Sequence, residues 1–295
     1  MFHPKKQLGQ NFLKNPEIAK RIVSSAEIKE SDTVIEVGSG TGILTEELVK
    51  TGAAVFAIEK DYKLITNLQN LYENTKNIKI VHQDALWFDL DVIASKAKQS
   101  KDRHDANASR DDSRGYKVVA NIPYNITSPL IRKFIEGENK PELMVLMVQK
   151  EVAERITAKP GDSNRGYLTL IVEFYADAEI LFEVSRKEFY PVPKVDSAVI
   201  KIITKKAHFQ GGLKDMVQPE FFFKIVKAGF AAKRKQVHNS LAATLKLDKD
   251  IVLKILSRAK IDPMLRAEDL TLEQWFKLSQ IIKNLHSDEG GLSIG

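Results

Sequence analysis

The sequence predicts an α/β fold in which a mostly parallel sheet with an antiparallel edge is followed by a small all-helical C-terminal domain. Short β-branched runs alternate with helical patterns up to about residue 175, and this alternation is typical of parallel strand pairing. Two further strand-like runs, at 174–182 and 195–203, predict the antiparallel edge. From Glu220 onward the apolar residues recur at helical spacing, which predicts the second domain.

The first predicted helix spans residues 15–26, with Asn15 as its N-cap and Pro16 at its first position. A β-branched strand at 33–37 then enters a turn with glycines at 38, 40 and 42, after which Ile43 begins a helix. Because position 43 is isoleucine, the turn lacks the GxGxxG pattern of dinucleotide-binding proteins. The next strands are predicted at 54–58, 78–83 and 117–120.

Four successive strands are each followed by residues suited to hold a ligand: Gly38, Glu59, Asp84 and Asn121. Ligands of open parallel sheets bind at the carboxyl ends of strands, so we expect these positions to converge. Glu59 lies 21 residues after Gly38, close to the roughly 20 expected of a ribose-binding carboxylate. The Asp84 carboxylate is suited to accept a hydrogen bond from an adenine amine. Taken singly, each acid is also consistent with a solvated strand end.

Asn121 opens the tetrapeptide Asn121-Ile122-Pro123-Tyr124. The Asn121 side-chain oxygen and the Ile122 carbonyl can both accept from one NH2 group, and the Tyr124 ring can stack on a flat base. Such a grip suits the exocyclic amine of adenine, because two acceptors localise a lone pair that is otherwise delocalised into the ring. A tight Asn/Pro turn after a strand is the alternative, and the glycine turn with Glu59 and Asp84 favours the first interpretation.

Composition excludes several classes of protein. The 295-residue chain has no cysteine, which excludes disulfides and thiolate metal sites and favours a reducing compartment. Its six histidines are scattered without metal-ligand spacing, so we expect no metal. No apolar run reaches about 18 residues and the N-terminus lacks a signal-peptide core, so we expect a cytoplasmic protein without a membrane span.

The net charge of +6 comes entirely from the last third of the chain. Residues 205–295 carry 16 Lys and Arg against 10 Asp and Glu, whereas residues 1–204 carry 29 of each. We therefore expect a catalytic domain at 1–204 and a basic helical domain at 205–295 that binds a polyanion. Lys233, Arg234 and Lys235 are the candidate RNA contacts, with a solvated helix face as the alternative.

Residues 94–115 fit neither domain, because they contain no Phe, Tyr, Trp, Val, Ile, Leu or Met and are dense in charge. Such a segment cannot bury enough surface to offset its ordering entropy. We expect a disordered insertion that spares the ligand site, with an additional RNA-binding arm as the alternative.

Further motifs carry a family resemblance. They are Gln10-Asn11-Phe12-Leu13, the segment 146–155 (LMVQKEVAER), the segment 189–197 (FYPVPKVDS) and the segment 231–241 (AAKRKQVHNSL). With Asn121-Ile122-Pro123-Tyr124, they make the chain resemble the ribosomal RNA adenine N6-dimethyltransferase family from about residue 5 to about residue 280. The resemblance implies a class I methyltransferase (Rossmann-like) sheet and S-adenosylmethionine as the cofactor.

The resemblance also implies site residues. The cofactor-binding set is Asn11, Leu13, Gly38, Gly40, Glu59, Asp84, Ala85 and Asn121. The catalytic set is Asn121, Pro123, Tyr124 and Phe189, with Tyr190 as an alternative to Phe189. Glycines would let the backbone approach the methionine moiety, Glu59 would hold the ribose, and two aromatic rings would stack on the target base.

The implied activity is transfer of methyl groups to the N6 amines of two adjacent adenines in small-subunit (16S) rRNA. The implied partner is that RNA in an assembling small ribosomal subunit, and we expect a monomer. Two alternatives are a related enzyme that modifies large-subunit rRNA and a non-catalytic RNA or transcription factor on the same scaffold. The KVDS motif and the segment 233–241 favour the small-subunit activity over the large-subunit one, and intact Glu59, Asp84 and Asn121 argue against a non-catalytic factor.

Overall fold

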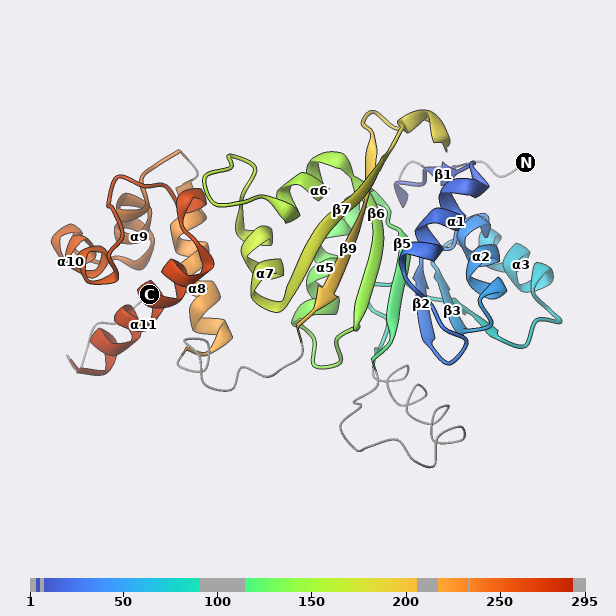
Figure 1. Ribbon diagram of the computed structural model, residues 1–295, viewed down its shortest axis with the longest axis horizontal. Coiled ribbons are helices and arrows are strands. Elements are labelled where there is room, and N and C mark those ends of the chain that lie inside the picture. The colour runs from blue at the N-terminus through green and yellow to red at the C-terminus, as the bar shows by residue number, and fades with distance from the viewer. Residues whose placement is uncertain (1–3, 6–7, 91–114, 206–216, 233, 289–295) are drawn as a thin grey trace, which may run out of the picture. The chain divides into compact units, whose positions relative to one another are not determined.

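The computed structural model describes residues 4–5, 8–90, 115–205, 217–232 and 234–288 (Figure 1). The expected insertion at 94–115 therefore lies outside the described residues except for Gly115. Lys233 and most of the expected linker at 205–219 also lie outside them.

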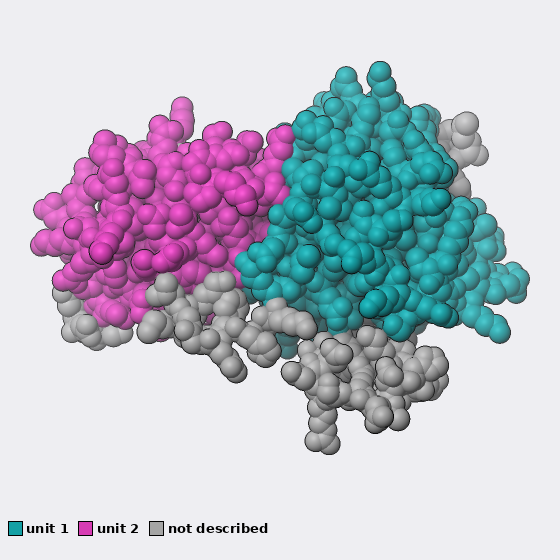
Figure 2. Space-filling view, in the orientation of Figure 1, with its two compact units in different colours: residues 1–153, 175–205 teal, residues 154–174, 206–295 magenta. Residues whose placement is uncertain are grey.

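The chain divides into two compact units, shown in different colours in Figure 2. Unit 1 comprises residues 1–153 and 175–205, and unit 2 comprises residues 154–174 and 206–295. The expected domain boundary after residue 204 lies next to residue 205, where the chain passes from unit 1 to unit 2 for the second time. Residues 154–174, however, were expected in the first domain and belong to unit 2. The physical reason is aromatic packing, since the Phe174 ring lies 4.9–5.4 Å from the rings of Phe222, Phe223 and Phe276.

Unit 1 contains a seven-stranded sheet with the order β4-β3-β2-β5-β6-β9-β7. Neighbours from β4 to β6 pair in parallel, whereas β9 is antiparallel to β6 and β7 is antiparallel to β9. The predicted fold class, mostly parallel with an antiparallel edge, is confirmed. The strands are β2 (Thr33–Val37), β3 (Ala54–Glu59), β4 (Ile78–His82), β5 (Lys117–Asn121), β6 (Leu143–Gln149), β7 (Ala176–Val184) and β9 (Ser197–Thr204).

Helices lie on both faces of this sheet, with α1, α2 and α3 on one side and α5 on the other (Figure 1). Their bounds are α1 (Pro16–Ser25), α2 (Ile43–Lys50), α3 (Tyr62–Leu71), α5 (Thr127–Glu136) and α6 (Lys150–Thr157). The predicted first helix is confirmed together with its cap, because the Asn15 side chain accepts from the Glu17 N–H at 3.0 Å. Strand alternation divides β6 between the two faces, and Val145 and Met147 join the core beneath α1 and α2.

A second, two-stranded sheet brings the N-terminal segment to the FYPVPKVDS segment. Strand β1 (Phe12–Leu13) pairs antiparallel with β8 (Phe189–Tyr190). Because successive strand residues point to opposite faces, Leu13 and Phe189 enter the core together, at 4% and 1% exposure. Phe12 and Tyr190 lie opposite each other on the other face, and Tyr190 is 53% exposed.

Unit 2 is helical, as predicted from the spacing after Glu220. Its helices are α7 (Tyr167–Tyr175), which ends in unit 1, and α8 (Pro219–Gly229), α9 (Val237–Leu245), α10 (Lys249–Ala259) and α11 (Leu272–Asp288). Short 3-10 helices lie at Tyr124–Ile126 and Arg186–Glu188 in unit 1 and at Phe230–Ala232 and Ala267–Asp269 in unit 2. The buried Arg165 guanidinium binds both Glu173 oxygens at 2.6 and 2.7 Å and so joins the start of α7 to its end.

Gly229 at the end of α8 gives a test of this helical core. A Cβ there would lie 2.2 Å from Cη2 of Trp275, which is fully buried. Gly229→Ala should therefore lower the free energy of unfolding by about 2 kcal/mol through overpacking, although Gly→Ala at an open helix site stabilises by up to about 1 kcal/mol.

Denaturant unfolding followed by circular dichroism measures this change. Gly166→Ala is the control, because a Cβ there would meet no atom closer than the Asn164 carbonyl oxygen at 4.0 Å. A Gly229→Ala variant as stable as wild type would show that α8 and Trp275 are not packed this closely.

Candidate functional site

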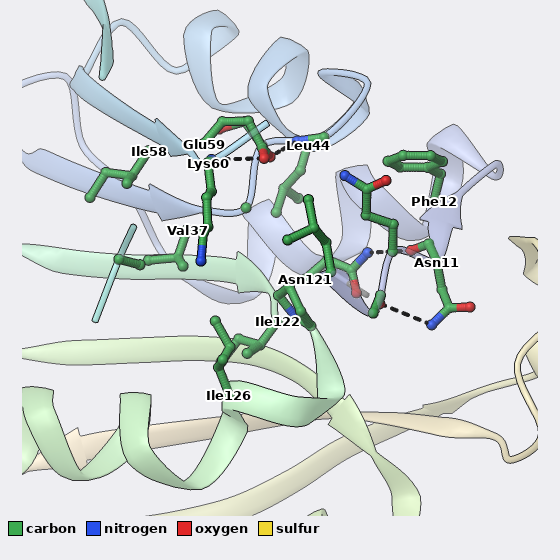
Figure 3. Close-up of a pocket in the computed structure, with 18 of the residues that line it drawn as sticks. Asn11, Phe12, Val37, Leu44, Ile58, Glu59, Lys60, Asn121, Ile122 and Ile126 are labelled. Carbon is green, nitrogen blue, oxygen red and sulfur yellow. Dashed lines mark hydrogen bonds between the residues drawn. The ribbon is translucent and has the colours of Figure 1, made fainter. Parts of the chain in front are cut away.

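A pocket with a cavity of about 150 Å³ lies at the carboxyl ends of the parallel strands in unit 1. Figure 3 shows Glu59, Asn121 and Asn11 around it, the first two at the ends of β3 and β5 and the third directly before β1. The structure brings together ten of the expected residues in its lining: Asn11, Leu13, Gly38, Gly40, Glu59, Asp84, Ala85, Asn121, Pro123 and Tyr124. Their convergence is a property of the fold, whereas their roles toward a cofactor and a base stay predictions.

The glycine turn after β2 is packed against protein rather than left open. Gly38 and Gly40 have φ of +73° and +58°, in the left-handed region that favours glycine. A Cβ on Gly38 would lie 3.5 Å from Pro123 Cδ and 3.6 Å from the Asn121 carbonyl oxygen, and one on Gly40 would lie 3.3 Å from the Phe12 ring. The positive φ is therefore what requires glycine at both positions, and Gly38 lies in van der Waals reach of the Asn121–Tyr124 segment while Gly40 faces Phe12.

Glu59 ends β3 as a buried carboxylate that is 7% exposed. Its Oε1 accepts from the Lys60 and Asp61 N–H groups at 2.8 Å each, and its Oε2 accepts from the Gly40 N–H at 2.9 Å. A carboxylate offers about four acceptor positions, so one position of Oε2 is left for a ligand hydroxyl. Glu59 also fixes the glycine turn to the end of the neighbouring strand.

Asp84 lies two residues beyond β4 and is held by its neighbours. Its Oδ2 accepts from Lys60 Nζ at 2.8 Å and its Oδ1 from the Leu86 N–H at 3.0 Å. The Lys60 hydrogen bond lowers the pKa of the Asp84 carboxyl, so it is an anion at neutral pH. The Ala85 carbonyl accepts from Lys133 Nζ at 2.9 Å, which holds this loop against α5.

The Asn121–Tyr124 segment is anchored from three directions. The Ile122 N–H donates to the Met147 carbonyl of β6 at 3.2 Å, and the Tyr124 hydroxyl bonds Ser197 Oγ at 2.9 Å. Asn121 Nδ2 donates to the Asn11 carbonyl at 3.3 Å (Figure 3). Because the amide nitrogen is used in this way, the Asn121 side-chain oxygen is the atom available to accept from a substrate amine.

Phe189 requires a correction. It was expected to stack on the target base, but its side chain is 1% exposed and belongs to the core cluster with Leu13. It is not part of the pocket lining. The reason is strand alternation in the short β1–β8 sheet, which turns Phe189 inward and leaves the alternative residue, Tyr190, on the exposed face.

The candidate RNA contacts lie in unit 2. Arg234 and Lys235 are exposed and directly precede Gln236, the N-cap of α9, as expected from the sequence. Lys233 lies outside the described residues.

Several residues that shape the site were missed by sequence reasoning. Phe12 packs on Gly40 and lines the pocket, and alternation with Leu13 is the signal that places it there. Lys133 Nζ donates to the carbonyls of Ala85, Leu86 and Phe88, a role that no local pattern reveals. Asp61 caps α3 and binds the N-terminal segment, and only its capping position can be read from the sequence.

Glu36 is a buried carboxylate in the strand that enters the glycine turn. It is 1% exposed in β2, and its Oε2 accepts from Thr45 Oγ1 of α2 at 2.7 Å. Burial raises the pKa of its carboxyl to about 7, against the opposing effect of the Thr45 hydrogen bond. Glu36 therefore ties the strand that carries the glycine turn to the helix that follows it.

The described part of the chain has neither a cluster of metal ligands nor a membrane-spanning helix. No three acidic or histidine side chains come together there in a way that suits a metal ion. None of its helices combines the length and apolarity needed to cross a bilayer.

Comparison with known proteins identifies relatives over nearly the whole chain. The family model described as "Ribosomal RNA adenine dimethylase" matches residues 1–284. The protein named "Ribosomal RNA small subunit methyltransferase A" from Dehalococcoides mccartyi is 41% identical over 93% of this chain and 87% of its own length. Its namesake from Lysinibacillus sphaericus is 38% identical over 95% of this chain and 92% of its own length.

Two solved structures are similar in fold as well as in sequence. A dimethyladenosine transferase from Plasmodium falciparum has a TM-score of 0.71 and 29% identity, covering 94% of this chain and 98% of that one. The "23S rRNA methyltransferase ErmE" has a TM-score of 0.66 and 25% identity, covering 92% of this chain and 100% of that one.

The buried Glu36 carboxyl predicts a pH dependence of stability. Its ordinary pKa is 4.5 and its folded pKa is about 7, so the folded state keeps a proton that the unfolded chain has lost. The associated stability is fully present below about pH 4.5 and is lost as the pH rises through 7. Relative to Glu36→Gln, which does not titrate, wild type should lose about 3 kcal/mol of unfolding free energy between pH 4.5 and 8.

Urea unfolding of both proteins at several pH values measures this difference. Two stability curves that run parallel with pH would show that Glu36 is not the titrating group.

Proposed function

Because the chain belongs to the ribosomal RNA adenine dimethylase family, we propose that it methylates the N6 amines of two adjacent adenines in small-subunit (16S) rRNA. The methyl donor is S-adenosylmethionine. One observation carries the proposal: the Asn121–Tyr124 segment packs directly on the glycine turn, so a grip for an amine and a cofactor site share one pocket.

The residues present fit the cofactor. Gly38 and Gly40 place a left-handed turn without side chains in the pocket lining, and Glu59 retains one acceptor position for a ribose hydroxyl. Asp84 and Ala85 line the same pocket beyond β4 and are suited to the adenine ring. When bound, S-adenosylmethionine supplies a methyl group activated by its sulfonium.

The protein contributes positioning to the reaction. The Asn121 side-chain oxygen and the Ile122 carbonyl accept the two hydrogens of the target amine and direct its lone pair into the pocket. Tyr124 supplies a ring for stacking, and its hydroxyl is held by Ser197 of the KVDS motif. Burial raises the pKa of Tyr124, so the ring stays neutral. The nitrogen becomes acidic once methylated and then releases its proton without a strong base.

The target adenine must leave its stack to enter such a pocket, because base chemistry of this kind requires an unpaired or flipped nucleotide. Unit 2, with exposed Arg234 and Lys235, supplies cations for the RNA backbone. We propose that the protein acts as a monomer in the cytoplasm on an assembling small subunit.

The large-subunit alternative has one observation in its favour, the similarity to ErmE. The small-subunit relatives share higher identity, 41% against 25%. Incubation with labelled S-adenosylmethionine and each purified ribosomal subunit, unmodified at its adenines, separates the two. We expect label on two adjacent adenines of small-subunit RNA. Label confined to large-subunit RNA would overturn the proposed substrate, and no label on either would overturn the proposed activity.

The grip on the amine is tested by Asn121→Ala. Because the Asn121 oxygen acts mainly as the lone pair is drawn toward the electrophile, the single-turnover rate should fall on the order of a hundredfold. The affinity for RNA should change far less. Circular dichroism is the control that the variant is still folded. Single-turnover methylation at the wild-type rate would exclude this role for Asn121.

The RNA contacts are tested by the salt dependence of binding. Changing Lys233, Arg234 and Lys235 together to Gln should flatten the log–log slope of RNA affinity against salt by about two units, since phosphate contacts release counterions. Cofactor affinity should not change.

A matched control removes three exposed charges elsewhere in unit 2, with Gln at Lys249, Lys254 and Arg258 of α10. If both triple variants flatten the slope equally, the effect is one of general charge and the cluster at 233–235 is not a specific contact.

A further inference from the structure

A strap formed by residues 8–13 lies along the pocket, and all six of its residues belong to the lining. The Asn11 carbonyl in this strap accepts from Asn121 Nδ2, and the Phe12 ring lies against Gly40. The strap therefore touches both the glycine turn and the segment that grips the amine. Its position sets the shape of the pocket at both places.

Asp61 holds the strap from outside the pocket. Its carboxylate is only 4% exposed, accepting from Lys5 Nζ at 2.8 Å and from Gln10 Nε2 at 3.1 Å. Lys5 and Gln10 also brace each other, since the Lys5 N–H donates to Gln10 Oε1 at 2.8 Å. Asp61 does not line the pocket itself.

Asp61 is firmly placed to serve as this anchor. It caps α3 by accepting from the Lys63 N–H at 3.1 Å, and its own N–H donates to Glu59. Burial alone would raise the pKa of the Asp61 carboxyl, but the hydrogen bonds from Lys5, Gln10 and the Lys63 N–H outweigh it and lower that pKa. The carboxylate is therefore charged, and charge-assisted hydrogen bonds are the stronger kind.

We propose that Asp61 is a positioning residue that latches the strap over the pocket and thereby sets the affinity for S-adenosylmethionine. For a ligand that binds only when the strap is closed, the apparent dissociation constant equals the intrinsic dissociation constant divided by the fraction of molecules with a closed strap. Loosening the latch lowers that fraction and weakens binding. Saturating cofactor closes the strap again, so the rate at saturation is preserved. The inference rests on the proposed function only in taking this pocket as the cofactor site.

The test is Asp61→Asn, because Asn retains the oxygen that caps α3, removes the charge that faces Lys5 and replaces the acceptor for Gln10 Nε2 by a donor. We expect cofactor affinity by calorimetry to fall about tenfold. Amide hydrogen exchange in residues 8–13 should become faster by a similar factor. The single-turnover rate at saturating cofactor should stay within about twofold of wild type.

Two further variants guard the interpretation. Lys5→Met leaves the cap on α3 intact and should weaken the cofactor by about threefold, because this partner is 47% exposed and its ion pair is screened. Asp248→Asn changes the equivalent cap of α10 in unit 2, where Asp248 accepts from the Asp250 N–H at 2.8 Å, and should change none of the three readouts.

Unchanged affinity and exchange in Asp61→Asn would overturn the latch, as would an equal effect of Asp248→Asn. A loss of saturating rate without a loss of affinity would also overturn it. Calorimetry and exchange need no RNA, so failure of the proposed substrate leaves this test intact. If wild type methylates no RNA but Asp61→Asn loosens the strap and weakens the cofactor, the proposed function fails and the latch stands.

Discussion

The Glu59 carboxylate is the interaction on which the site depends. One buried side chain accepts three backbone N–H groups, from Gly40 in the turn after β2 and from Lys60 and Asp61 where α3 begins. An unpaired buried donor costs about 1–3 kcal/mol, so this arrangement fixes two strand ends relative to each other. The glycine turn held in this way packs on Pro123 and on the Asn121 carbonyl, which carries the constraint across to β5.

The proposed cofactor site and the proposed grip on the amine are consequently joined by structure rather than placed side by side. The strap contacts the glycine turn through Phe12 and the Asn121–Tyr124 segment through Asn11. Asp61, which follows Glu59 and Lys60 in the chain, holds the strap by accepting hydrogen bonds from Lys5 and Gln10. Methyl transfer from a sulfonium needs alignment more than acid–base chemistry. A site built from interlocked turns supplies that alignment, and the KVDS serine adds to it by holding the Tyr124 hydroxyl.

Sequence reasoning identified the sheet, its antiparallel edge and the convergence of Gly38, Glu59, Asp84 and Asn121, because these follow from hydrophobic period, from glycines and from the rule that ligands meet strand ends. Asn11 and Leu13 came from the family resemblance alone. It misjudged Phe189, since a motif gives no information on which face of a two-residue strand points inward. It also assigned residues 154–174 to the first domain. Phe174 packs on Phe222 and Phe276, which lie far along the chain, and such long-range packing leaves no signal in the local sequence. Lys133 and the Asp61 latch are long-range contacts of the same kind.

The most direct measurement of the central claim is calorimetric titration of wild type and Glu59→Ala with S-adenosylmethionine in the absence of RNA. If the strand ends form the cofactor site and Glu59 supplies its ribose acceptor, the variant should bind more weakly by roughly 1–3 kcal/mol. Circular dichroism should show that the variant is still folded. Unchanged affinity in a folded Glu59→Ala protein would contradict the account.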